Sequence, residues 1–96
     1  MLTIWVARLL ISKRVADKIR EKHALTPAQV RQAIVEVAGL EFSWDFESTR
    51  GLRAIVNVQL YRSSTQQTED ALVVLYPTDN PIDQAWRLGS AYFTRG

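Results

Sequence analysis

The side chains best suited to acid–base and phosphate chemistry are arginines, tyrosines and one histidine. Cleaving a phosphodiester beside a ribose 2′-hydroxyl without a metal needs a base, an acid for the leaving oxygen and cations for the phosphate. Histidine, tyrosine, lysine and arginine can fill those roles. An expected strand presents Arg53, Asn57 and Tyr61 on one face. Depending on strand register, four more residues can join that face: Tyr76, Arg87, Tyr92 and Arg95.

His23 is the single histidine and has two readings. Imidazole titrates near neutral pH, so His23 is a candidate general base. It also ends the apolar stripe of an expected helix, where its ring can pack and its charged form would meet the negative end of the helix dipole. We favour the structural reading and keep His23 among the catalytic candidates.

Other chemistries have weaker support. One histidine and no cysteine cannot form the usual zinc ligand sets. Asp45 with Glu47, and Asp79 with Asp83, are the closest carboxylate pairs, but paired carboxylates on a strand are more often solvated. The four glycines form no phosphate-binding loop. We therefore expect neither a metal ion nor a cofactor.

Composition bounds the class of protein. The 96 residues suit a single domain spanning 1–96, and 47% hydrophobic residues suffice for one modest core. Residues 1–31 contain seven basic and two acidic side chains, whereas residues 36–47 contain four acidic side chains and no basic one. This asymmetry indicates either an anionic partner at one end of the molecule or an ordinary solvated basic helix face.

The first eleven residues do not read as a targeting segment. They lack a basic start, Arg8 interrupts the apolar run, and the run is too short to cross a bilayer. The absence of cysteine fits a reducing compartment. We expect a cytoplasmic protein that does not enter a membrane.

Two helices are expected between Ser12 and Val37, separated at Ala24 and Leu25. Helical spacing places the apolar residues of each on one stripe: Val15, Ala16, Ile19 and His23 in the first, and Val30, Ala33, Ile34 and Val37 in the second. Thr26, Pro27 and Gln29 predict a capping box with proline in the first turn of the second helix. Such short helices need a surface to pack on.

Five strands are expected around the helices. Alternating or continuous apolar patterns predict strands at Trp5–Ile11, Leu40–Glu47, Leu52–Tyr61, Ala71–Tyr76 and Ala85–Arg95. The core face is expected to include Leu40, Phe42, Trp44 and Phe46, and then Leu52, Ala54, Val56, Val58 and Leu60. Arg62–Asp70 is predicted to be a loop and Pro77–Gln84 a turn region. Gly89 is expected at a bulge or a close backbone approach, and Trp86 and Phe93 in the core.

The order strand, helix, helix and then four strands predicts an α+β fold. We expect a four-strand antiparallel meander with both helices packed on one sheet face. The other face of the sheet is left partly open.

The stretch from Lys18 to Val30 resembles the "Lys-His-Gly-Val-Ser/Thr, two residues, Glu" signature of BrnT-like toxins. Ala24 stands where that family usually has glycine, and Gln29 stands near its acidic position. Arg87–Tyr92 is similar to the "Arg-Ile-Ile-Ser-Ala-Arg" ending of BrnT-like chains, with Tyr92 in place of the last arginine. The order of elements is similar over nearly the whole chain.

BrnT-like toxins belong to the RelE-like superfamily of small ribonucleases in toxin–antitoxin pairs. The resemblance implies an RNA-binding protein, either a metal-independent endoribonuclease or a degenerate relative, that a cognate antitoxin neutralises. The candidate catalytic residues are then Arg53, Arg87, Tyr76 and His23. The candidate RNA-binding residues are Lys18, Lys22, Arg53, Tyr61 and Arg95. Arg53→Ala and Arg87→Ala should weaken RNA binding without unfolding the domain.

Two other readings stay open. One is a non-catalytic module on the same fold that joins a protein partner through a sheet edge or the acidic strand face. The other is a homodimer with Trp5, Trp44 or Trp86 in its interface.

Overall fold

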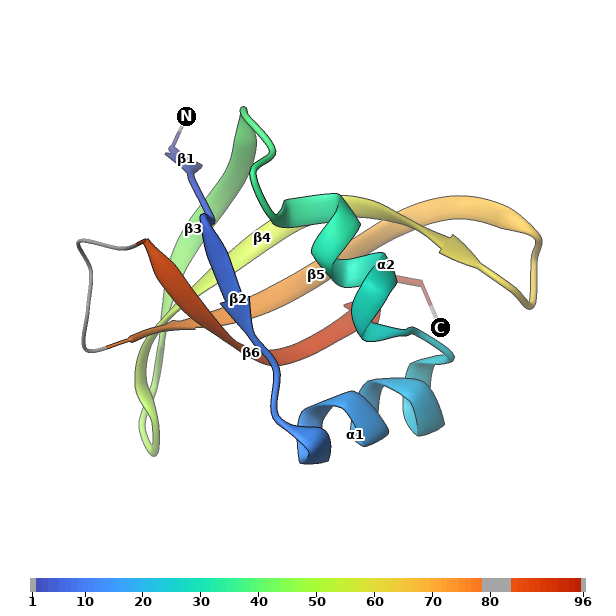
Figure 1. Cartoon of the computed structure of the whole chain (residues 1–96), viewed down its shortest axis with the longest axis horizontal. Helices are drawn as coiled ribbons and strands as arrows, with labels where there is room; N and C mark the ends of the chain where they lie inside the picture. The colour runs from blue at the N-terminus through green and yellow to red at the C-terminus, as the bar shows by residue number, and fades with distance from the viewer. Residues whose placement is uncertain (1, 79–83, 96) are drawn as a thin grey trace.

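The computed structural model describes residues 2–78 and 84–95. Its elements follow the order β1 Thr3–Ile4, β2 Arg8–Leu10, α1 Lys13–His23, α2 Pro27–Ile34, β3 Leu40–Glu47, β4 Gly51–Arg62, β5 Gln67–Pro77 and β6 Ala85–Phe93. The strands form one curled mixed sheet in the order β1-β3-β4-β5-β6-β2 (Figure 1). The predicted α+β class and the antiparallel meander of the last four strands are confirmed.

The N-terminal segment differs from the single strand predicted at Trp5–Ile11. Its first part, β1, pairs antiparallel with β3 at one edge of the sheet, and β2 pairs parallel with β6 at the other edge. The few residues between β1 and β2 span at most about 14 Å. A flat six-stranded sheet would hold its edges about 24 Å apart. The sheet must therefore curl until both edges reach one short segment.

Both helices begin at a capping residue, and that of the second is the one predicted. The Ser12 hydroxyl accepts a hydrogen bond from the Val15 N–H at 3.2 Å. In α2, Thr26 and Gln29 form the complete capping box, with Pro27 in the first turn. The prediction that the second helix reaches Val37 is wrong. Val35 is extended and bridges to the buried Val6, so the helix ends at Ile34.

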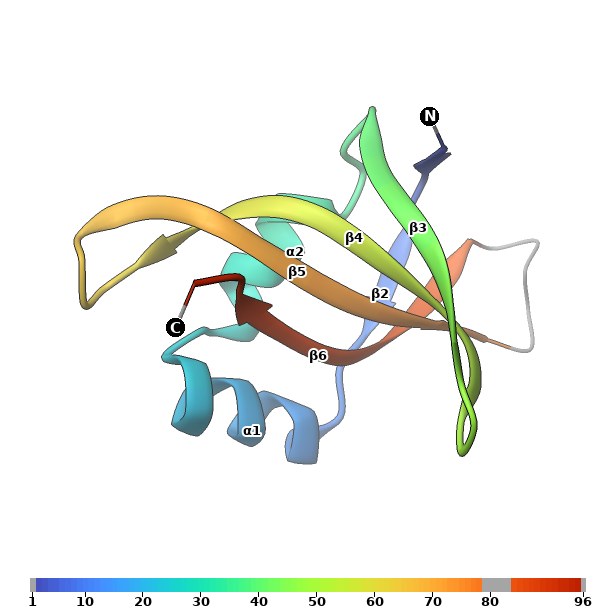
Figure 2. The same ribbon diagram turned by 180° about the vertical axis from the view of Figure 1, so that it is seen from behind.

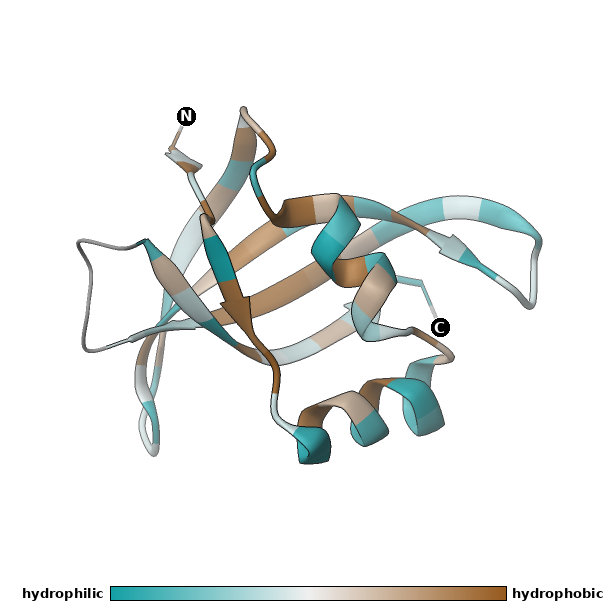
Figure 3. Ribbon diagram, viewed as in Figure 1, coloured by the Kyte–Doolittle hydropathy of each residue, from teal (hydrophilic) through white to brown (hydrophobic). Residues whose placement is uncertain are grey.

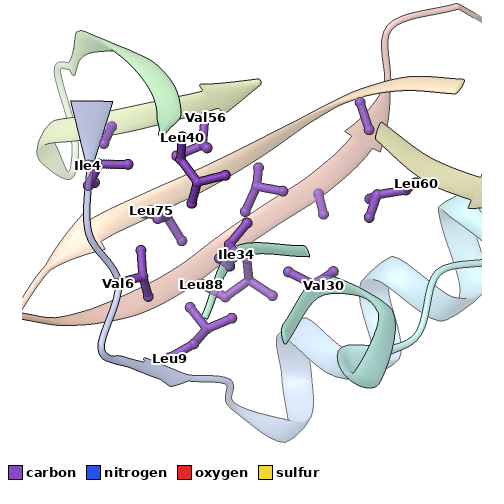
Figure 4. Packing of buried hydrophobic residues seen from close by; sticks show 14 of the residues in the cluster. Ile4, Val6, Leu9, Val30, Ile34, Leu40, Val56, Leu60, Leu75 and Leu88 are labelled. Carbon is purple, nitrogen blue, oxygen red and sulfur yellow. The ribbon is translucent and has the colours of Figure 1, made fainter. Parts of the chain in front are cut away.

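One core joins the helices to the sheet. α2 packs over β4 and α1 lies along β6. The largest fully buried side chains come from both helices, the N-terminal segment and the sheet: Ile19, Leu25, Ile34, Leu75, Leu88, Val6, Val30, Val56 and Val73. Figure 4 shows side chains from the N-terminal segment, α2 and the sheet meeting in one cluster, to which Ile19 of α1 also belongs. The predicted packing of the helices on the sheet is therefore confirmed.

Side-chain burial decreases from the start of β3 to its end, so the predicted core face is wrong for the end of this strand. Leu40 is 8% exposed, whereas Trp44 is 46% and Phe46 is 71% exposed. Leu52, opposite Phe46 on β4, is 47% exposed. The tip of the β3–β4 hairpin projects away from α2, so the alternating pattern continues beyond the surface that the helices cover (Figure 1).

The central strand is predicted correctly, and the hairpin loop before it is shorter than predicted. The strand at Ala71–Tyr76 does lie inside the sheet, between β4 and β6. The predicted loop at Arg62–Asp70 is too long, because β4 runs to Arg62 and β5 starts at Gln67, and the turn itself is confined to residues 63–66. This end of the hairpin is hydrophilic, as Figure 3 shows, so no apolar alternation marks it in the sequence. Neither described helix combines the length and apolar character needed to cross a bilayer.

Candidate anion-binding site

The site is built around a bulge between β5 and β6. Val74 is opposite Ser90, but Leu75 is opposite Leu88, so Gly89 is the extra residue. The Tyr76 ring lies against Gly89: a Cβ atom added there would be 2.3 Å from Cε2 of Tyr76. Gly89 thus shows both features predicted for it, a bulge and a close approach.

A cavity of about 410 Å³ lies beside this contact. Its lining comes from the start of α1, the β3–β4 turn, the end of β5 and the bulge: Ser12, Arg14, Val15, Lys18, Arg50, Tyr76, Arg87, Leu88 and Gly89. We call it the Tyr76 cavity. Figure 2 shows α1 and the tip of the β3–β4 hairpin on the same side of β6.

The electrostatics of the Tyr76 cavity are one-sided. It has four basic side chains and no acidic one among its described lining residues. Within residues 2–78 and 84–95, the ion pairs involve Lys13, Arg20, Arg53 and Arg62, and none involves a basic residue of this cavity. The cavity can therefore attract an anion from solution.

Tyr76 is held in place at the cavity wall. It is 8% exposed, and its hydroxyl donates to Oε2 of Glu47 at 3.2 Å. The guanidinium carbon of Arg50 lies 5.7 Å from the centre of its ring, within the range of a cation–π contact. The phenol therefore has a proton acceptor on one side and a cation over its face.

Arg53 lies next to this group but does not line the cavity. Its Nε donates to Oδ2 of Asp45 at 2.7 Å. That hydrogen bond, with a smaller contribution from Tyr76, holds the pKa of Arg53 above its ordinary value. Arg53 is therefore a cation whose charge is already partly balanced.

A second cavity, of about 460 Å³, lies at the C-terminal end of α1. It is lined by Glu21, Lys22, His23, Ala24, Arg62, Ser64, Tyr92, Phe93 and Arg95, and we call it the His23 cavity. The His23 and Tyr92 ring centres are 6.1 Å apart. Burial, and then the charges of Lys18 and Lys22, lower the pKa of His23.

The structure divides the sequence-predicted residues between these places. Lys18, Tyr76 and Arg87 share the Tyr76 cavity. Lys22, His23 and Arg95 share the His23 cavity. Tyr61 lines neither cavity; its side chain is exposed, and its carbonyl accepts from Gln29.

Trp86 and Phe93 are partly buried against the core, as predicted. Arg14 and Arg50, by contrast, are cavity residues that the sequence reasoning missed. Arg14 lies four positions before Lys18, so both are on one helix face, and this spacing could have identified it. No sequence signal identifies Arg50, because its place depends on how the β3–β4 turn folds over the sheet.

The carboxylate pairs considered above as metal ligands form no metal centre within the described residues. Residues 2–78 and 84–95 contain no group of three or more histidine or acidic side chains able to hold a metal ion. Asp45 accepts a hydrogen bond from Arg53, and Glu47 accepts one from Tyr76. Asp79 and Asp83 lie outside the described residues.

Comparison with known families, curated proteins and solved structures finds no match to this chain. The structure itself shows a small α+β fold with two helices near the N-terminus and a curled mixed sheet. A functional assignment therefore has to come from the chemistry of the Tyr76 cavity and from this fold.

Proposed function

We propose that this protein is a RelE-like, toxin-type RNA-binding protein that places a backbone phosphate in the Tyr76 cavity. The observation that carries the proposal is the convergence of four basic side chains on one cavity without a carboxylate partner. Arginine and lysine make charge-assisted hydrogen bonds to phosphate oxygens. The fold is consistent with a RelE-like one.

The backbone conformation of Ala24 is compatible with the resemblance at Lys18–Val30. It ends α1 in a left-handed conformation with φ of 54°, which glycine adopts at little cost. The next residue continues the cap, since the Leu25 N–H bonds to the Ile19 carbonyl at 3.1 Å. The glycine that BrnT-like chains carry at this point suits the same backbone turn.

For metal-independent cleavage, we assign removal of the ribose 2′-hydroxyl proton to Tyr76 instead of His23: the phenol would pass its own proton to Glu47 and take that of the 2′-hydroxyl, and the leaving oxygen would take a proton from water. The Tyr76 hydroxyl is hydrogen-bonded to the Glu47 carboxylate and lies with the unpaired cations, whereas His23 lies at the other cavity. Arg87 and Lys18 would stabilise the charge that develops on the phosphate. Tyr76→Phe should then retain RNA binding and lose cleavage in the presence of a chelator.

The decisive test is salt-dependent binding of a fluorescein-labelled single-stranded RNA, followed by anisotropy between about 50 and 200 mM salt. Each phosphate contact contributes about −0.7 to the slope of log K against log salt, so four cations predict a slope of about −3. Arg87→Ala should weaken binding about tenfold, in line with a lost charge-assisted contact. Arg53→Ala should weaken it less, because Asp45 already holds that guanidinium.

Arg20→Ala is the matched control. Arg20 is an exposed cation of α1 that pairs with Asp17 and does not line the cavity. Its removal should change affinity much less than Arg87→Ala does, because salt screens an exposed charge that does not touch the RNA. Equal losses in Arg20→Ala and Arg87→Ala would mean that only overall charge attracts RNA. Growth arrest on induction, relieved by a neighbouring gene product, tests the proposed toxin role and its antitoxin.

A further inference from the structure

The outer edge of β3 is open over its second half. The short strand β1 covers its beginning, where Thr3 is opposite Glu41 and Ile4 opposite Leu40. From Trp44 to Glu47, the described residues place β4 on one side and no strand on the other. An open edge of this kind can accept an added strand.

The backbone direction identifies the groups that face the open side. The Phe42 N–H donates to the Leu2 carbonyl at 3.2 Å, so it points toward the outer edge. Backbone direction repeats every two residues along a strand, so the N–H and C=O groups of Trp44 and Phe46 point the same way. These groups can pair with an incoming backbone.

One side of this edge is apolar and hollowed. Trp44 and Phe46 are largely exposed, and Trp44 packs edge-on against Phe42 with ring centres 5.1 Å apart. The ring centres of Trp44 and Trp86 are 6.2 Å apart. A groove of about 380 Å³ runs beside them, lined by Thr3, Ile4, Trp5, Phe42, Trp44, Pro77, Thr78, Gln84, Ala85 and Trp86. We call it the aromatic groove.

The other side of the same strand is acidic. Glu41, Asp45 and Glu47 alternate with the aromatic residues and so point to the opposite face. Asp45 has one cationic partner, Arg53, and Glu47 accepts a hydrogen bond from the Tyr76 hydroxyl. An added strand would therefore meet an apolar surface on one face. On the other face it would meet three carboxylates, of which Asp45 is already partly balanced by Arg53.

This charge pattern disfavours a second copy of the chain. Antiparallel self-pairing centred on Asp45 places two Asp45 carboxylates opposite each other. Pairing centred on Phe46 places Asp45 opposite Glu47. Like charges in directly opposite positions destabilise a strand pair. The complementary partner is one whose side chains alternate between apolar and basic.

We propose that the open edge of β3 captures, by strand addition, an extended segment of a protein partner in which apolar and basic residues alternate. The apolar residues would pack on Trp44, Phe46 and the aromatic groove, and the basic residues would lie beside Asp45 and Glu47. Main-chain hydrogen bonds would supply affinity, and the alternation would supply specificity. The proposed strand site lies apart from the cations of the Tyr76 cavity but shares one residue with it, Glu47, which accepts a hydrogen bond from the Tyr76 hydroxyl.

The test uses fluorescein-labelled peptides of about eight residues, a typical strand length. A peptide alternating valine and lysine should bind at least tenfold more tightly than one alternating valine and glutamate. Binding should weaken with salt and shift the tryptophan emission to shorter wavelength. Equal affinity for the two peptides would overturn the proposal.

N-methylation of the peptide backbone tests strand addition without altering the protein. Alternate residues of the bound peptide would direct their N–H groups toward β3 or away from it. Methylation of the first set should abolish binding, and methylation of the second set should leave it unchanged. Equal effects of the two sets would overturn the proposal. Arg87→Ala should leave peptide binding unchanged, which separates this site from the Tyr76 cavity. A dimer that dissociates on Phe46→Glu substitution would assign the edge to self-association and also overturn the proposal.

Discussion

The two cavities at the ends of α1 are similar in size and both contain several basic side chains, but within the described part of the chain only the His23 cavity contains an arginine that is paired with a carboxylate. In the Tyr76 cavity, Arg14, Lys18 and Arg87 have no carboxylate partner among the described residues. In the His23 cavity, Arg62 pairs with Glu69 at 3.2 Å, donates to the Arg95 carbonyl at 2.8 Å and lies 4.8 Å from the centre of the Phe93 ring.

This difference separates two uses of the same side chain. Arg62 ties the β4–β5 hairpin to the C-terminal end of β6, and its charge is balanced within the protein. The bond from Thr65, and then Arg62, hold the pKa of Glu69 below its ordinary value, as expected for a carboxylate inside a local network. The basic groups at Tyr76 lack such a network and remain available to an external anion.

The largest expected effect is that of Gly89→Ala. The new methyl group would lie 2.3 Å from Cε2 of Tyr76, so the ring or the β6 bulge must move. Such overpacking typically lowers the free energy of unfolding by about 1–3 kcal/mol. Displacement of Tyr76 should also weaken RNA binding, whereas the His23 cavity should keep its structure. Chemical denaturation and the anisotropy assay measure the two effects.

A double-mutant cycle checks that the Tyr76 ring is the cause. Gly89→Ala should cost much less stability in a Tyr76→Ala background, because the clashing atoms are gone. An equal cost in both backgrounds would place the strain in the backbone of the bulge and not in the ring contact.

The second prediction compares the loss of Arg62, an arginine that stabilises the fold, with the loss of Arg87, an arginine proposed to bind RNA. Arg62→Ala should lower the free energy of unfolding by about 1 kcal/mol, since it removes a cation–π contact and an ion pair. Its RNA affinity should change little. Arg87→Ala should do the opposite: tenfold weaker binding and stability within about 0.5 kcal/mol of the parent. A loss of both properties in each variant would remove the distinction between the cavities.

Local chemistry explains which parts of the fold were predictable. Thr26, Pro27 and Gln29 determine the start of α2 through contacts within one turn, and the sequence shows them directly. The apolar run at Ala71–Tyr76 likewise identifies the central strand. The split of the N-terminal segment depends instead on how far the sheet curls, which no local pattern encodes.

The site was predictable only in part for the same reason. Lys18, Tyr76 and Arg87 were identified by residue type, but their meeting depends on the register shift at Gly89. Residue type also selected His23, which the fold places at the other end of α1. The sequence shows which side chains could take part in acid–base or phosphate chemistry. The bulge and the β3–β4 turn determine which of them share a cavity.

The smallest expected effect concerns how stability depends on pH through His23. Because burial and the charges of Lys18 and Lys22 lower the pKa of His23 from 6.5, the unfolded chain binds this proton more readily than the folded one. Stability from this group is present above pH 6.5 and is lost as pH falls through the folded pKa. The loss is small because His23 is only partly buried. Denaturation between about pH 5 and 8 should show this slope, and His23→Gln should flatten it. If the free energy of unfolding depends on pH equally steeply in the His23→Gln variant, another group is responsible for the titration.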